Sequence, residues 1–141
     1  MDLLIAAITM WLSVISGLPT PHEHPSVRFL PPEALSDLRY GSIEAQRRRE
    51  VVAVYEDETQ TIYLSDTWSG RDPADVSILV HELVHHLQNA AGLEYECPAA
   101  REQLAYEVQA RWLKLFGRDL ESEFDLDAMT LKLMSSCLSS A

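Results

Sequence analysis

The chain has 141 residues, of which 47% are hydrophobic and 23% charged, and its formal net charge at pH 7 is −11. This length and composition predict one folded domain over residues 1–141 and exclude a fibrous or low-complexity chain. The acidic balance argues against a nucleic-acid partner, because phosphates are bound through clustered lysines and arginines. The dense basic cluster at residues 47–49 lies between Glu44 and Glu50, so we interpret it as a solvated turn or helix end.

Residues 3–18 are almost wholly apolar and resemble the core of a signal peptide. No lysine or arginine precedes them, and no small-x-small cleavage site follows. The run is also shorter than the ~20 residues that a membrane span needs. We therefore predict a buried structural helix, no stable membrane span and a cytoplasmic location. The alternative is the cell envelope or secretion, if residues 1–18 act as a signal.

The next segment, residues 19–25, contains three prolines and is predicted to be a loop. His22 and His24 in this loop are interpreted as solvated side chains, since no third metal ligand is nearby. A short strand is expected at residues 27–30, and a helix begins at residues 31–35. The β-rich runs 51–55 and 61–64, joined by a polar turn, predict a β-hairpin.

Three helices are expected in the second half of the chain. Asp72 is a good N-cap, Pro73 suits the first helical position and Gly92 can end the helix, which predicts a helix over about 73–91. A second helix is expected at 98–116, ending at Gly117, and a last one at 127–137. These elements predict an α+β fold with a small antiparallel sheet.

The first of these helices contains the pattern H-E-x-x-H, with His81, Glu82 and His85. Residues four apart lie on one helical face, so both imidazoles can reach one metal ion. Glu82 lies about 100° round the helix, where it can take a proton from a metal-bound water. Gln88 falls near the ligand face. His86 projects to a flank and is a residue near the ligands or substrate, or simply a surface residue.

A catalytic zinc usually has three protein ligands and one open position. The candidates for the third ligand are Glu102 and Glu107 on the second helix, with Glu94 and Glu96 in the preceding loop. Glu102 shares its helical face with core-like residues that include Gln109, whereas Glu107 shares its face with solvent-like residues. We therefore predict that Zn²⁺ is held by His81, His85 and Glu102.

The H-E-x-x-H motif followed by Glu102-Gln103-Leu104-Ala105-Tyr106 resembles the gluzincin metallopeptidases. The run through Gln109 also resembles uncharacterised small bacterial metallopeptidase families. This resemblance covers about half of the chain and implies a zincin-like fold, in which an edge strand above the active-site helix binds the substrate backbone. Many gluzincins have an aspartate at the position of Tyr106, and that aspartate orients a ligand histidine. Tyr106 either takes this role through its hydroxyl or faces the substrate.

The predicted function is zinc-dependent hydrolysis of a peptide or protein substrate, with Glu82 as the general base. The donor that stabilises the oxyanion stays open among Tyr55, Tyr63, Tyr95, Tyr106 and His86. The alternatives are a non-catalytic metal-binding domain that recognises a protein partner, a hydrolase of a small amide or ester, and a structural interaction protein. The sequence does not predict the oligomeric state.

Two cysteines, Cys97 and Cys137, either form one disulfide or remain two buried thiols. Neither lies in a C-x-x-C pair, which argues against redox catalysis and a thiolate zinc site. A bridge between them is a hypothesis that would tie the last helix to the start of the Glu102 helix.

Overall fold

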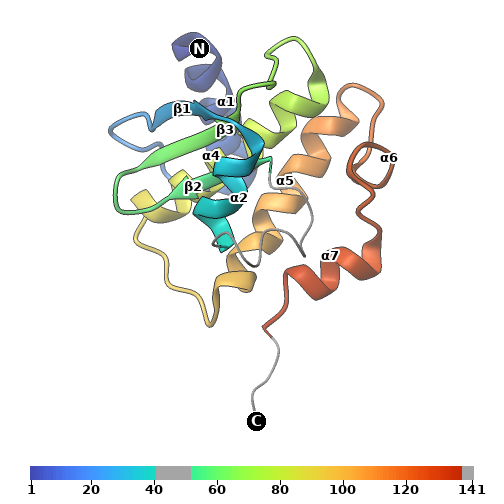
Figure 1. Cartoon of the computed structure of the whole chain (residues 1–141). Coiled ribbons are helices and arrows are strands. Elements are labelled where there is room, and N and C mark those ends of the chain that lie inside the picture. The colour runs from blue at the N-terminus through green and yellow to red at the C-terminus, as the bar shows by residue number, and fades with distance from the viewer. Residues whose placement is uncertain (41–51, 138–141) are drawn as a thin grey trace.

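The computed structural model describes residues 1–40 and 52–137 of the chain. The expected basic turn at residues 47–49 and the start of the first hairpin strand, Val51, lie outside the described residues. Figure 1 shows a small sheet and a set of helices packed around one central helix, α4. In the described residues six α-helices and three strands make up this α+β fold, as the sequence predicts.

The sheet contains β1 (Ser26–Leu30), β2 (Ala53–Glu56) and β3 (Thr61–Ser65) in the order β1-β3-β2. β2 and β3 form the predicted antiparallel hairpin, whereas β1 pairs with β3 in parallel. The prediction of a purely antiparallel sheet is therefore wrong. The helix α2 (Pro32–Tyr40) follows β1, and a strand that is followed by a helix can return in parallel to a later strand.

The central helix α4 runs over Pro73–Ala90 and lies between the sheet and α5 (Glu102–Lys114) (Figure 1). The predicted start is confirmed, because the Asp72 side chain accepts a hydrogen bond from the Ala74 N–H and Pro73 opens the helix. Gly92, at φ +68°, follows the helix end. Every residue from 76 to 88 is buried, so α4 is enclosed by packing on all sides.

The apolar helix α1 (Asp2–Ser16) packs into the same core through Ile5, Ile8 and Leu12. The indole of Trp11 meets that of Trp112 on α5 edge to face, with 5.5 Å between ring centroids. The predicted burial of α1 therefore holds for one face only, because Leu3, Met10 and Val14 are exposed. Among the described helices, none combines the length and apolar character that crossing a bilayer requires.

The second predicted helix begins with a 3₁₀ turn, η1 (Pro98–Arg101), and continues as α5. The last predicted helix corresponds to α7 (Ala128–Met134), which is shorter than expected. The short helix α6 (Leu120–Phe124) was not predicted. A disulfide joins Cys97 to Cys137, so one of the two expected cysteine states is confirmed. This bridge ties the end of α7 to the residue before η1.

Candidate metal centre

Three potential metal-ligand atoms from two helices converge in the structure. The imidazoles of His81 and His85 on α4 and the carboxylate of Glu102 at the start of α5 offer atoms that all lie within 4.8 Å of one another. His81 Nε2 lies 2.8 Å and His85 Nε2 3.1 Å from the carboxylate oxygens of Glu102. These three side chains form a group that can hold a metal ion.

The local structure explains why the three atoms meet. His81 and His85 are one helical turn apart, so their rings lie on the same side of α4, with centroids 5.0 Å apart. η1 turns the chain so that α5 packs along α4 with Glu102 as its first residue. Both histidines are at most 7% exposed, so the group is largely shielded from water.

The far nitrogen of each ligand histidine is held by a glutamine. His81 Nδ1 donates to Gln109 Oε1 at 2.9 Å, and His85 Nδ1 donates to Gln88 Oε1 at 2.9 Å. In this structure Nε2 of each ring makes the hydrogen bond to the Glu102 carboxylate. Were an ion to replace the proton of that bond, a ring that keeps its proton on Nδ1 would offer the ion the lone pair of Nε2. The expectation that Gln88 lies near the ligand face is confirmed. Gln109 was not recognised as a site residue, although its place on the inward face of the helix with Glu102 is the signal that could have found it.

The electrostatics of the group favour a positive charge between the three residues. Burial of Glu102 would raise its pKa, but its hydrogen bonds to His81 and His85 outweigh this effect and leave the pKa far below its usual range. Burial would lower the pKa of His81, whereas its hydrogen bond to Glu102 and the charges of Glu82 and Glu102 raise it. The opposite shifts mean that a proton is attracted to the position where a cation would bind.

Glu82 lies between the two ligand histidines in sequence but does not belong to the ligand group. Its side chain is buried, with 8% of the residue exposed, and its charge acts on His81. Within residues 1–40 and 52–137, no hydrogen bond or ion pair occupies its carboxylate.

His86 is turned away from the metal group. It is 2% exposed, and its Nε2–H donates to the Glu23 carbonyl at 2.9 Å. Its Nδ1 then accepts from the Tyr55 hydroxyl at 2.8 Å. Burial lowers the pKa of His86, and the bond to Glu23 offsets this only in part. The interpretation of His86 as a surface residue is therefore wrong, because the side chain is buried and both ring nitrogens are used within the fold.

The tyrosines considered as oxyanion donors also differ in their surroundings. The hydroxyl of Tyr55 is held by His86 and by the Asn89 amide, 3.0 Å away. Tyr63 lies in the central strand β3, and Tyr95 lies in the loop after α4. The ring of Tyr106 packs edge to face on His81, with 4.5 Å between centroids. Of the four tyrosines, only Tyr106 is shown to contact a ligand histidine.

The rejected ligand candidates lie in solvent. Glu94, Glu96 and Glu107 are exposed and lie outside the three-residue group. His22 and His24 are exposed as well, in agreement with their interpretation as solvated loop residues. The preference for Glu102 over Glu107, made from helical faces alone, agrees with this arrangement.

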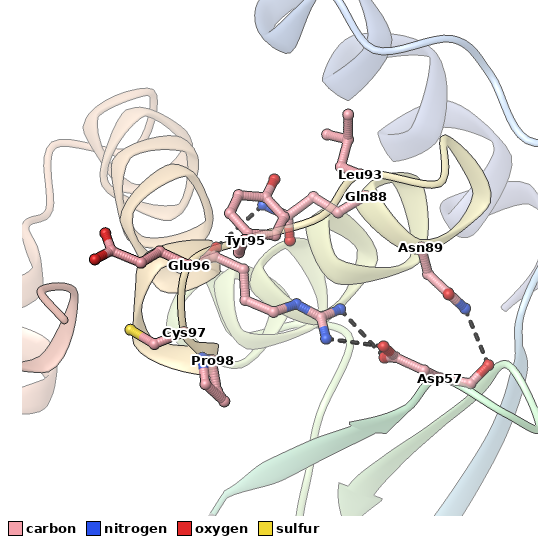
Figure 2. Close-up of a pocket in the computed structure, with 9 residues that line it drawn as sticks. Asp57, Gln88, Asn89, Leu93, Tyr95, Glu96, Cys97 and Pro98 are labelled. Atoms are coloured by element: carbon pink, nitrogen blue, oxygen red, sulfur yellow. Dashed lines mark hydrogen bonds and ion pairs between the residues drawn. The ribbon is translucent and has the colours of Figure 1, made fainter.

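A cavity of about 330 Å³ opens at the C-terminal end of α4 (Figure 2). Its lining includes Gln88, Asn89, Tyr95 and an ion pair in which both Arg101 Nη atoms bind the Asp57 carboxylate. Gln88 also hydrogen-bonds to His85, whereas His81, His85 and Glu102 themselves are not among the residues that line the cavity. The Asp57–Arg101 pair was not predicted, because the partners are 44 residues apart in the sequence.

Comparison with known proteins identifies a family for the chain, through a family model alone. No curated protein and no solved structure matches it. A family model described as a domain of unknown function (DUF6647) matches residues 1–140. The chain therefore belongs to the DUF6647 family of domains of unknown function.

Proposed function

We propose that this protein is a zinc-dependent metallopeptidase with a zincin-like fold. The observation that carries the proposal is the convergence of His81, His85 and Glu102, with Glu82 beside them on the same helix. This is the ligand set of two histidines and one carboxylate that peptidase zinc sites use, with one position left for water or substrate.

The distances in the group suit zinc. Tetrahedral ligands at about 2.0–2.1 Å from a zinc ion lie roughly 3.3 Å from one another. The histidine nitrogens lie 2.8 and 3.1 Å from the carboxylate oxygens of Glu102. These two separations are close to that value, whereas the three ligand atoms as a set lie within 4.8 Å and would have to draw together to take the ion. The mixed N/O set favours zinc over magnesium or calcium.

When bound, zinc would polarise the scissile carbonyl and lower the pKa of a coordinated water toward ~7. Glu82 takes the proton of the attacking water on its free carboxylate and delivers it to the leaving amine. Its burial keeps competing solvent away from this transfer. Tyr106, packed against His81, is the tyrosine best placed to face the reacting group.

The surroundings support a peptide as the substrate. In the described sheet β2 is an edge strand, and it packs on α4. An extended peptide can add to such an edge through main-chain hydrogen bonds. The cavity lined by Gln88 and Arg101 offers room for a substrate side chain, and the hydrogen bond of Gln88 to His85 links its lining to the metal group. The disulfide supports a location outside the reducing cytosol, contrary to our expectation from the sequence.

The test is cleavage of a mixed peptide library, read by mass spectrometry. Wild-type protein with one zinc per chain should cleave peptides, lose the activity on treatment with a chelator and regain it when zinc is returned. The Glu82→Gln variant should keep its zinc and lose roughly 10²–10⁴-fold in rate. A zinc-loaded wild type that cleaves no peptide would instead favour the non-catalytic metal-binding domain.

A further inference from the structure

Both ligand histidines are held by neutral amides rather than by carboxylates. Gln109 and Gln88 are 4% and 1% exposed, so each is a buried polar side chain whose hydrogen bonds must all be found within the protein. Each gives its amide oxygen to the Nδ1–H of one histidine. Metal-binding histidines commonly donate this proton to a carboxylate or a carbonyl.

The Gln109 amide is locked in one orientation. Its Nε2 donates to Ser77 Oγ at 3.1 Å, and the Ser77 hydroxyl donates onward to the Ala74 carbonyl at 2.6 Å. A flipped amide would set its oxygen against the Ser77 oxygen, whose proton is already used. The chain of bonds therefore runs in one direction from His81 to the first turn of α4.

The Gln88 amide is held in one orientation by a backbone carbonyl. Its Nε2 donates to the Arg101 carbonyl at 3.1 Å, and a carbonyl can only accept. Arg101 is itself fixed, because its guanidinium binds the Asp57 carboxylate through two hydrogen bonds and lies 3.4 Å from the His85 carbonyl. Arg101 immediately precedes Glu102, so this lock also steadies the third ligand.

We propose that Gln88 and Gln109 are positioning residues that select Nε2 of His85 and His81 as the metal-binding atoms. This inference rests on the proposed metal site. The two amides hold the Nδ1 protons without adding negative charge, so Glu102 supplies the single anionic ligand. A divalent ion then keeps a net positive charge, which favours polarisation of the substrate over the tightest possible retention of the metal.

Removing the amide acceptor and adding a negative charge should change the zinc affinity in opposite directions. A leucine at position 88 or 109 removes the acceptor, and the loss of such a partner typically weakens metal binding 10–100-fold. A glutamate at position 109 keeps an acceptor for His81 Nδ1 and adds a negative charge, while the Ser77 hydroxyl must turn its proton from the Ala74 carbonyl to the new carboxylate oxygen. With that proton turned, Gln109→Glu should bind zinc more tightly than wild type. A merely structural glutamine would not produce a gain.

The experiment is a chelator-competition titration of zinc with wild type, Gln88→Leu, Gln109→Leu and Gln109→Glu, together with visible spectra of the Co²⁺ forms. Gln103→Glu is the matched control, because Gln103 is exposed and adjoins Glu102. We expect a 10–100-fold loss for each leucine variant, a gain for Gln109→Glu and a change below about twofold for Gln103→Glu. The Co²⁺ spectrum should change in the leucine variants and persist in Gln109→Glu.

Three outcomes would overturn the inference, and they are distinguishable. Wild-type zinc affinity in folded Gln88→Leu and Gln109→Leu variants would remove the positioning role and leave the metal site standing. An unchanged or weaker affinity in Gln109→Glu would contradict it as well, even if the leucine variants fail to fold. A wild type that takes up neither zinc nor cobalt would overturn the proposed function together with this inference.

Discussion

Histidine side chains on the two sides of α4 have different hydrogen-bond partners. On the side facing α5, His81 and His85 turn Nε2 toward Glu102 and give only Nδ1 to the fold. On the side facing the sheet, His86 gives one nitrogen to Tyr55 and the other to the Glu23 carbonyl. All three histidines are buried. Burial alone therefore does not identify a candidate metal ligand, whereas a ring nitrogen that faces a carboxylate and a second imidazole does.

The largest effect should come from removing the α5-facing pair. His81→Ala/His85→Ala deletes two of the three ligands of a site worth on the order of 10 kcal/mol, so zinc affinity should fall by roughly 10⁴-fold or more. Equilibrium dialysis with zinc measures the loss. The control is His22→Ala/His24→Ala, which removes two exposed histidines and should leave the affinity unchanged. Equal losses of zinc affinity in both double variants would contradict the assignment of His81 and His85 as metal ligands.

The disulfide should matter for stability and not for the metal. Cys97→Ala/Cys137→Ala opens a link across 40 residues, which should lower the free energy of unfolding by about 4 kcal/mol. Urea denaturation measures this change. Zinc stoichiometry at low temperature should stay at the wild-type value, because Arg101 anchors the start of α5 without the bridge. Loss of zinc from a folded variant would show that the bridge also positions Glu102.

On the sheet-facing side, a substitution should damage the fold and spare the site. His86→Ala leaves the Glu23 carbonyl without this donor and opens a gap beside Tyr55, so unfolding should require about 2–3 kcal/mol less free energy. Chemical denaturation provides the value, with Tyr55→Phe as a milder variant that removes the hydroxyl alone. If His86→Ala instead abolished zinc binding while the protein stayed folded, His86 would belong to the metal site.

The smallest expected effect is a dependence of zinc binding on pH. The pKa of His81 is raised by its bond to Glu102, whereas the lowered pKa of Glu102 keeps that carboxylate ionised. Below the pKa of His81 a proton must leave before zinc binds, so affinity should fall about tenfold per pH unit as the pH decreases. Calorimetry in buffers of different ionisation enthalpy should detect proton release. No release near pH 6 would contradict the proton shared with Glu102.

The sequence was most informative where local rules operate. Asp72, Pro73 and Gly92 mark the start and end of α4, and the four-residue spacing places His81 and His85 on one face. Helical faces also distinguished Glu102, on the inward side of the predicted helix, from Glu107 on its solvent side. Each of these inferences depends on residues within about two helical turns of one another, where side-chain direction follows from helix geometry.

Long-range partners were not predictable in the same way. The partners of His86 lie 31 and 63 residues away in sequence, and Gln109 is 28 residues from His81. The parallel pairing of β1 depends on how the chain returns after α2, which no local pattern encodes. Helix α6 has five residues, too few for a helical period to be visible in the sequence.

The most direct test of the account is the metal content of purified wild-type, Glu102→Gln and Glu107→Gln proteins, measured after zinc is supplied and excess is removed. We predict one zinc per wild-type and Glu107→Gln chain and a clear reduction in Glu102→Gln, because only Glu102 lies within reach of both histidines. No bound metal in the wild type, or equal zinc in all three proteins, would contradict the assignment of His81, His85 and Glu102 as a metal centre.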